Sequence, residues 1–257
     1  MVKGLYTAYT GMINEQHRMD VLTNNLANSD TNGYKKEGAT SQAFDTVLVD
    51  KIKDMSEPGR LNRRVGTANF GVKIGENYTD YSQGAFKVTG NKYDLAIAGD
   101  GFFNVEFTNK AGETSTKYTR DGAFVVNTDG YLVTKDGDFV LGDNGRIKID
   151  PTQDVSIDAR GYISQGGAEV GKIKLTDFMD LNYLEHYGEN YYQPVEGATE
   201  KTTVGAIRQG YIETSNVQVV QEMVEMISVS RQYESNQKLI TTIDETLGIA
   251  AQQLGKV

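Results

Sequence analysis

The sequence predicts an α+β fold in which helices at the two chain ends pair as a coiled-coil-like stalk beside a central, mainly antiparallel β-domain. Apolar residues recur with 3–4 spacing near both ends, which keeps one side of a helix against a neighbour. Between these ends, apolar and polar residues alternate and turn dipeptides recur, which is typical of short strands. The expected segments are a helix over 1–30, an arm over 31–75, a β-domain over 76–212 and a helix over 213–257.

Each terminal helix is expected to carry an apolar assembly seam. On the first helix the seam comprises Leu5, Met12, Met19, Leu22 and Leu26, and on the last helix Val219, Met226, Tyr233, Ile240, Leu247 and Leu254. The intervening row on the last helix is expected at Met223, Ser230, Gln237, Asp244 and Ala251. A strict seven-residue repeat implies a left-handed supercoil. An ordinary helical hairpin packed on its own domain explains the same periodicity, but the position at both ends favours assembly through the termini.

Local signals set the helix limits. Ser215 and Gln218 form a capping-box pattern, which predicts that the last helix starts at Asn216. Asn32-Gly33 follows the first helix, and Gly33 is expected to adopt a positive φ at a bend. Asn should be tolerated there better than the β-branched Val.

The middle of the chain predicts a β-meander. The dipeptides that supply positive φ for two-residue turns recur at Asp121-Gly122, Asp129-Gly130, Asp136-Gly137 and Asn144-Gly145. Before it, residues 34–75 are locally basic and are interpreted as a solvated, extended arm.

Composition and motifs exclude several functions. The formal charge of -9 over 257 residues argues against nucleic acid as a partner. The absence of Cys excludes disulfides and thiolate metal sites, and no apolar run approaches a membrane span. His17 and His186 lack the spacing of a metal pair, so we expect no catalytic residue, metal or cofactor. Asp136, Asp138 and Asp143 could hold calcium, although hairpin turns explain them better.

Three ordered blocks carry a family resemblance. Near the start stand Ala8-Tyr9-Thr10-Gly11-Met12, Asn24-Asn25-Leu26-Ala27-Asn28 and Thr31-Asn32-Gly33-Tyr34-Lys35. The central block joins residues 95–105 with Tyr118-Thr119-Arg120-Asp121-Gly122, and the last block ends with Arg231-Gln232-Tyr233-Glu234-Ser235-Asn236. Together they resemble the flagellar rod and hook protein family. Ser29-Asp30 and Tyr34 depart slightly from its usual pattern.

The resemblance implies a structural role without catalysis. Members of that family stack helically into a hollow shaft, with the terminal helices lining the inner tube. The chain's length and long arm resemble the distal rod members most, with a similar-sized proximal rod protein as the other choice. Expected partners are copies of the chain itself, other rod and hook proteins, and the export apparatus. The expected location is the basal body outside the cytoplasmic membrane, reached without a cleaved signal peptide. The alternative is a secreted β-domain enzyme, or a carbohydrate or calcium binder, with a helical stalk.

Overall fold

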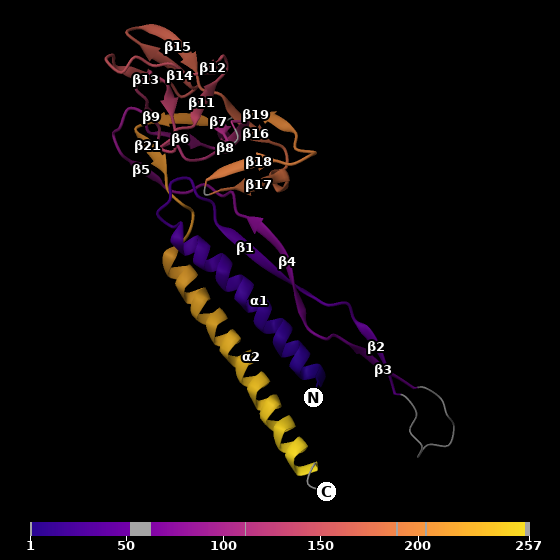
Figure 1. Cartoon of the computed structure of the whole chain (residues 1–257). Helices are drawn as coiled ribbons and strands as arrows, with labels where there is room; N and C mark the ends of the chain where they lie inside the picture. Colours follow the sequence, from indigo (N-terminus) through magenta and orange to yellow (C-terminus); the bar gives the residue numbers. More distant parts are fainter. Residues whose placement is uncertain (1, 52–62, 111, 189, 204, 255–257) are drawn as a thin grey trace. The chain divides into compact units, whose positions relative to one another are not determined.

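The computed structural model describes residues 2–51, 63–110, 112–188, 190–203 and 205–254. It divides the chain into two compact units. The helix unit comprises Met1–Leu26, Glu37–Thr79 and Val219–Val257, and the β unit comprises Ala27–Lys36 and Asp80–Gln218. The predicted α+β class is confirmed, because helices form both ends of the chain and antiparallel strands form its middle (Figure 1).

The helix unit combines two long helices with a β-ribbon. Helices α1 (Val2–Ala27) and α2 (Val219–Leu254) lie side by side in opposite directions (Figure 1). The ribbon consists of two antiparallel strand pairs, β1 (Glu37–Ala43) with β4 (Val72–Thr79) and β2 (Val47–Lys51) with β3 (Arg63–Ala68). The arm expected from the sequence is therefore a hydrogen-bonded ribbon along its described residues, and it groups with the two helices.

The β unit contains the remaining strands and one short 3-10 helix. Its largest sheet has ten strands, which follow the order β17-β18-β8-β7-β11-β10-β9, with β12, β16 and β19 attached to this path. The strands of this sheet are β7 (Phe102–Thr108), β8 (Thr114–Thr119), β9 (Val125–Val126), β10 (Leu132–Val133), β11 (Phe139–Gly142), β12 (Gly145–Arg146), β16 (Leu175–Phe178), β17 (Leu184–Tyr187), β18 (Tyr191–Pro194) and β19 (Glu200–Thr202).

Smaller antiparallel sheets complete the unit. They are β13-β14-β15, β20-β6 and β21-β5. Their elements, with the 3-10 helix η1 (Leu181–Tyr183), are β5 (Phe86–Val88), β6 (Leu95–Ala98), β13 (Val155–Ile157), β14 (Tyr162–Gln165), β15 (Ala168–Lys172), β20 (Ala206–Gln209) and β21 (Tyr211–Glu213).

The predicted meander is present from β9 to β12, but one of the four predicted turn positions was wrong. Gly130, Gly137 and Gly145 have φ values of 84°, 97° and 104°, as tight turns between successive strands require. Asp121-Gly122 does not connect two paired strands. Gly122 instead permits a close approach, because a Cβ there would overlap the Leu95 carbonyl oxygen.

Two hydrophobic clusters form the core of the β unit, on opposite faces of β7. Phe103, 0% exposed, belongs to the larger cluster, and Phe102, 1% exposed, belongs to the smaller one. Successive side chains of a strand point to opposite faces, so these neighbours serve different cores. The larger cluster contains Leu95, Ile97, Phe103, Phe124, Leu132, Val140, Ile147, Ile149, Val155, Ile157, Ile163, Ile173 and Ile207.

The predicted start of the last helix was wrong by three residues. Helix α2 begins at Val219, and Ser215 Oγ accepts a hydrogen bond from the Val217 N–H at 3.2 Å in place of the expected capping box. The reason lies in Asn216, whose side chain is bound elsewhere. Its Nδ2 donates to the Asp80 carbonyl at 2.8 Å, and its Oδ1 accepts from the Lys36 N–H at 2.7 Å. These bonds hold Asn216 outside the helix.

Candidate assembly site

Helices α1 and α2 pack antiparallel in a single register. A Cβ at Gly4 would lie 3.8 Å from Ile243 Cδ1, and a Cβ at Gly11 would lie 3.0 Å from Asn236 Nδ2. Between these contacts α1 advances by seven residues while α2 recedes by seven. The hydrogen bond from Asn25 Nδ2 to Glu222 Oε2, at 3.3 Å, is two further repeats along the same register. The interface therefore follows the predicted heptad spacing.

Glycine at one interface position lets the helices approach closely. Glycine inside a helix costs about 1 kcal/mol relative to alanine, so Gly4 and Gly11 weaken α1 taken alone. At Gly11, however, a side chain would press against Asn236, whereas a Cβ at Gly4 would make only an ordinary contact with Ile243. Gly11 is therefore explained by the neighbouring helix and not by the propensity of α1.

The structure places the predicted seam residues on the side of each helix that is partly covered. Leu22 is buried, and Leu5, Met12, Met19, Leu26, Met226, Tyr233 and Ile240 are half-buried. Val219 and Leu247 are each 38% exposed, and the Leu254 side chain lies outside the described residues. Contact of these side chains with a neighbouring subunit stays a prediction.

The intervening row of α2 was predicted one residue too late. The row that faces α1 contains Glu222, 0% exposed, and Val229, 1% exposed, followed by half-buried Asn236 and Ile243. Met223, expected in that row, is 48% exposed. The spacing left the position of this row open by one residue, and its polar members gave no hydrophobic signal that could have decided between the two rows.

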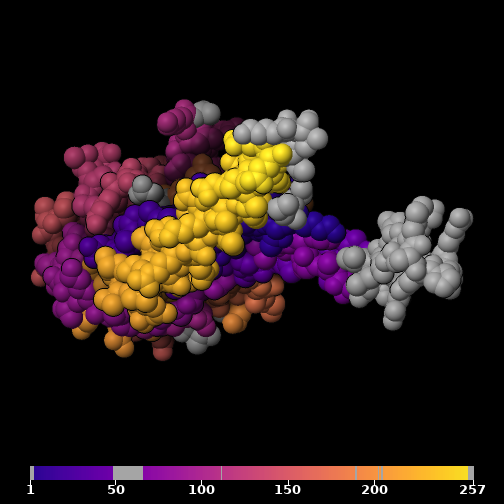
Figure 2. All heavy atoms as spheres, turned by 90° about the horizontal axis from the view of Figure 1, so that it is seen from below, coloured from indigo at the N-terminus to yellow at the C-terminus, as the bar shows by residue number. Residues whose placement is uncertain are grey.

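A second apolar stripe, on α2, faces solvent. On α2, Val220, Val224 and Ile227 are 76%, 63% and 54% exposed. Ile227 and Val224 also line a groove of about 390 Å³ with Ser228, Arg231, Gln232 and Ser235. On α1, Tyr6 and Tyr9 are at least half exposed. Figure 2 shows the outer face of α2 uncovered along its length. The 3–4 spacing of residues 220, 224 and 227 was the signal that could have identified this stripe.

The β-ribbon covers another side of α1. Asn14 Nδ2 donates to Ser41 Oγ at 2.8 Å, and the Lys3 ammonium lies 4.8 Å from the centre of the Phe70 ring. Asn25 pairs with the backbone of Glu37, donating to its carbonyl at 2.7 Å and accepting from its N–H at 2.9 Å. Helix α1 is thus packed between α2 and the ribbon.

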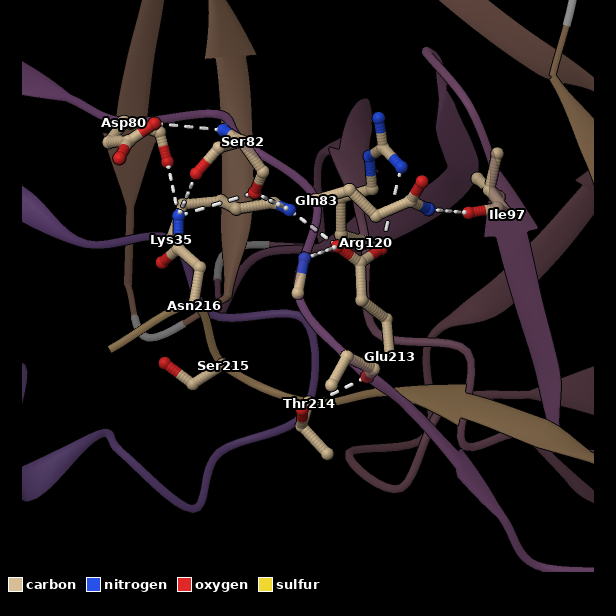
Figure 3. Close-up of polar contacts among 12 residues, drawn as sticks. Lys35, Asp80, Ser82, Gln83, Ile97, Arg120, Glu213, Thr214, Ser215 and Asn216 are labelled. Atoms are coloured by element: carbon tan, nitrogen blue, oxygen red, sulfur yellow. Dashed lines mark hydrogen bonds and ion pairs between the residues drawn. The ribbon is translucent and has the colours of Figure 1, made fainter. Parts of the chain in front are cut away.

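The β unit contains a buried charged cluster next to Gly33. Glu213, whose side chain is 0% exposed, accepts from Lys35 Nζ at 2.5 Å and lies 3.4 Å from Arg120 Nη1. The Gly84 N–H also donates to this carboxylate, at 2.9 Å. Figure 3 shows Lys35, Arg120 and Glu213, which come from separate segments of the chain, with their polar contacts. It joins the segment that follows α1 to the strand that precedes α2.

Burial is the largest influence on the pKa values of the two cations in this cluster. It lowers the pKa of Lys35 although the carboxylate of Glu213 acts in the opposite direction. The pKa of Arg120 is lowered for the same reason, with the same opposition from Glu213. Two buried cations share one carboxylate, so loss of Glu213 would leave both charges without their closest partner.

Gly33 lies where the predicted turn was expected, and the structure adds a steric reason for glycine. Its φ is 67°, and its N–H donates to the Glu213 carbonyl at 2.9 Å. A Cβ at Gly33 would lie 2.5 Å from the backbone carbon of Arg120. The backbone of Arg120 therefore crowds any side chain at this position, and the expected better tolerance of Asn than of Val stays a prediction.

Some of the remaining candidates for chemistry have structural partners. Asp138 accepts from the Tyr191 hydroxyl at 2.9 Å, and the two residues line a pocket of about 380 Å³ together with Asp121 and Asp136. Burial raises the pKa of Tyr191. His186 packs edge-on against Tyr34 and Tyr192, and His17 lies on α1. In the described part of the chain, no three His, Cys, Asp or Glu side chains are placed to hold a metal ion.

Comparison with known proteins identifies the family of this chain. Three family models match: flagella basal body rod protein over residues 5–35, flagellar hook protein FlgE/F/G D1 domain over 96–165, and flagellar basal body rod FlgEFG protein C-terminal over 208–253. Full-length similarity to curated rod proteins decides the family. FlgG of Agrobacterium fabrum is 34% identical, with 98% of this chain and 100% of the relative covered. The chain belongs to the flagellar basal-body rod protein family. The resemblance predicted from the sequence is confirmed.

Other relatives of this rod protein agree. FlgF of Caulobacter vibrioides is 36% identical with both chains fully covered, and FlgG of Bacillus subtilis is 36% identical over 96% of this chain and 97% of the relative. The terminal family models include most of α1 and α2, and the N-terminal model includes Gly33 and Lys35. Neither helix of the described chain is long and apolar enough to cross a membrane.

Proposed function

We propose that this rod protein is a structural subunit of the flagellar basal-body rod and polymerises helically into a hollow, torque-transmitting shaft. The observation that carries the proposal is the exposed apolar stripe on α2, with exposed Tyr6 and Tyr9 on α1, in a chain similar to rod proteins along its whole length. Large contiguous apolar surfaces on soluble proteins mark interaction sites. The partners are copies of this chain together with other rod and hook components.

The helix pair suits a filament because it presents more than one contact face. Tyr6 and Tyr9 lie on the exposed side of α1, and Val220 and Val224 lie on that of α2. The two faces differ in shape and chemistry, so one face of a subunit would meet a different face of the next. Such heterologous contacts that do not close into a ring produce an open helical filament. The predicted seam residues contribute the half-buried remainder of this surface.

The position in the rod is the distal one. The rod proteins of Agrobacterium fabrum and Bacillus subtilis that resemble this chain are named FlgG, and one of comparable identity, from Caulobacter vibrioides, is named FlgF. The long ribbon from β1 to β4 supports this choice. The subunit acts outside the cytoplasmic membrane, reaches the rod through the flagellar export apparatus without a cleaved signal peptide, and catalyses no reaction.

Assembly of the purified chain tests the proposal. At increasing concentration, electron microscopy should show tubes of uniform width, and a rod-deficient strain should regain swimming when it carries the gene. Val224→Asp should prevent both at concentrations where the unsubstituted chain assembles, while the monomer stays folded, because a charge on the exposed stripe opposes burial in a contact. A chain that stays monomeric at every concentration and restores no motility would contradict the proposal. Sugar or calcium binding at the pocket around Asp138 would then favour the alternative function.

A further inference from the structure

The interface between α1 and α2 contains a polar pair that helix packing does not require. Asn25 and Glu222 are both 0% exposed, and they are joined by the 3.3 Å hydrogen bond from Asn25 Nδ2. Asn25 is itself held by its two hydrogen bonds with the Glu37 backbone. Loss of a hydrogen bond between two buried polar side chains is unfavourable, because water does not replace the lost partner. The position of Glu222 along α1 is therefore tied to that of Asn25.

The seven-residue repeat alone leaves the register of the helix pair open. Gly4 and Gly11 are one repeat apart on α1, and Asn236 and Ile243 are one repeat apart on α2. A slide by one repeat, about 10.5 Å, would place Gly11 against Ile243 and keep the same spacing. The apolar and small residues therefore discriminate weakly between the native register and its neighbours.

The polar pair discriminates strongly between these registers. In one direction of the slide, Asn25 meets Val229 and Glu222 moves beyond the last residue of α1. In the other direction, Glu222 meets Arg18, but Asn25 then faces Ser215, which precedes α2. Either slide breaks the bond between Asn25 and Glu222. A single buried polar residue is known to fix the register of helix pairs in this way, at some loss of stability.

We propose that Asn25 and Glu222 form a register lock, which determines which residues of the two terminal helices lie side by side. The lock is a property of the single chain and can be measured without assembly. Its consequence rests on the proposed function, because the register sets where Tyr6 and Tyr9 stand relative to Val220 and Val224 on the surface that a neighbouring subunit would meet.

Paired cysteines can read the register directly, since the chain has no cysteine of its own. The native register is reported by Gly11→Cys with Asn236→Cys and by Gly4→Cys with Ile243→Cys. A slide by one repeat is reported by Gly11→Cys with Ile243→Cys and by Gly4→Cys with Asn236→Cys. In the dilute full-length monomer under mild oxidation, the native pairs should form disulfides at least roughly tenfold faster than the slipped pairs, the ratio that 1.4 kcal/mol of preference produces.

Removal of the carboxylate tests the lock itself. In the Glu222→Leu background, the preference for native pairs should fall to roughly threefold or less, because the hydrogen bond that distinguishes the native register is then absent. Glu222→Gln should keep the native preference, since its amide can still bond with Asn25. If native pairs still formed disulfides about tenfold faster in Glu222→Leu, the proposal would be overturned. The segments that connect the helices to the rest of the chain would then determine the register.

Two controls make every outcome informative. Far-ultraviolet circular dichroism reports whether the helices persist, and if Glu222→Leu is not helical, the smaller Glu222→Ala chain is used with the same criterion. Disulfide yields are measured on monomers isolated by size exclusion, so a failure of the chain to polymerise leaves the register result intact. A lock confirmed in a chain that never assembles would support this inference and contradict the proposed function.

Discussion

The helix unit and the β unit bury their apolar side chains to different extents. In the β unit, Leu95 and Phe103 are completely buried within a cluster of thirteen hydrophobic residues. Among the described side chains of α2, Val229 is the one hydrophobic residue that reaches this degree of burial, whereas Val220 and Val224 are largely exposed. Burial of apolar surface is the main source of stability. The β unit therefore carries its own core, and the helix unit keeps apolar surface available for a partner.

The largest expected effect concerns Gly33, at the charged cluster of the β unit. Gly33→Ala should lower the free energy of unfolding by roughly 3 kcal/mol or more, because left-handed strain adds to overpacking against the backbone of Arg120. Gly90 is the matched control, since its φ of 69° is similar and nothing lies within 4 Å of an added Cβ. Gly90→Ala should cost about 1 kcal/mol, from strain alone. Equal losses in urea denaturation would show that the Arg120 backbone can move aside.

The next effect concerns the charge of the cluster. Glu213→Gln should destabilise the β unit by about 3 kcal/mol, because two buried cations lose their counter-charge. Glu106 offers the control, since it forms an ion pair with the partly exposed Arg146 at 2.8 Å. Glu106→Gln should cost less than about 1 kcal/mol. A small loss for Glu213→Gln in thermal unfolding would indicate that the cluster is hydrated.

A smaller and pH-dependent effect is expected for Lys35. Burial lowers its pKa, so at alkaline pH the folded chain releases this proton before the unfolded chain does. Between the folded pKa and the ordinary value of about 10.5, the unfolded state binds more protons, and the contribution of Lys35 to stability rises with pH. Relative to Lys35→Met, the wild-type chain should gain stability as the pH rises through this window and stay constant below it. A parallel pH dependence of the two chains would contradict this assignment.

The smallest effect on the monomer is expected on the exposed stripe of α2. Val224→Asp should change the free energy of unfolding by no more than about 0.5 kcal/mol, because Val224 is 63% exposed. Its critical concentration for assembly should nevertheless rise at least tenfold, corresponding to about 1.4 kcal/mol per contact. Val170→Asp, at a valine of the β unit that is 43% exposed, is the control and should assemble normally. If Val170→Asp lost assembly and Val224→Asp did not, the contact surface would have to lie on the β unit.

The sequence by itself determined the class of the fold and its family. Spacing of seven identified both terminal helices, and Asp-Gly and Asn-Gly pairs identified three turns of the meander. These signals can be recognised in the sequence because they are local. The direction of a side chain follows from the repeat of the helix or strand, and glycine marks positions where a positive φ is permitted. The three motif blocks likewise depend only on residue order, and they led to the correct family.

Only the tertiary structure decided which residues these local elements oppose. In a hydrophobic pattern, polar side chains such as Glu222 and Asn25 are predicted to face solvent. Each is nevertheless fully buried, because it is hydrogen-bonded to a partner from a distant part of the chain. The same holds for Lys35 and Glu213, and for the backbone of Arg120 that excludes a side chain at Gly33. Burial of a polar group is favourable only when a specific partner is present. The choice of that partner is made by the packing of segments distant in sequence, which no local pattern records.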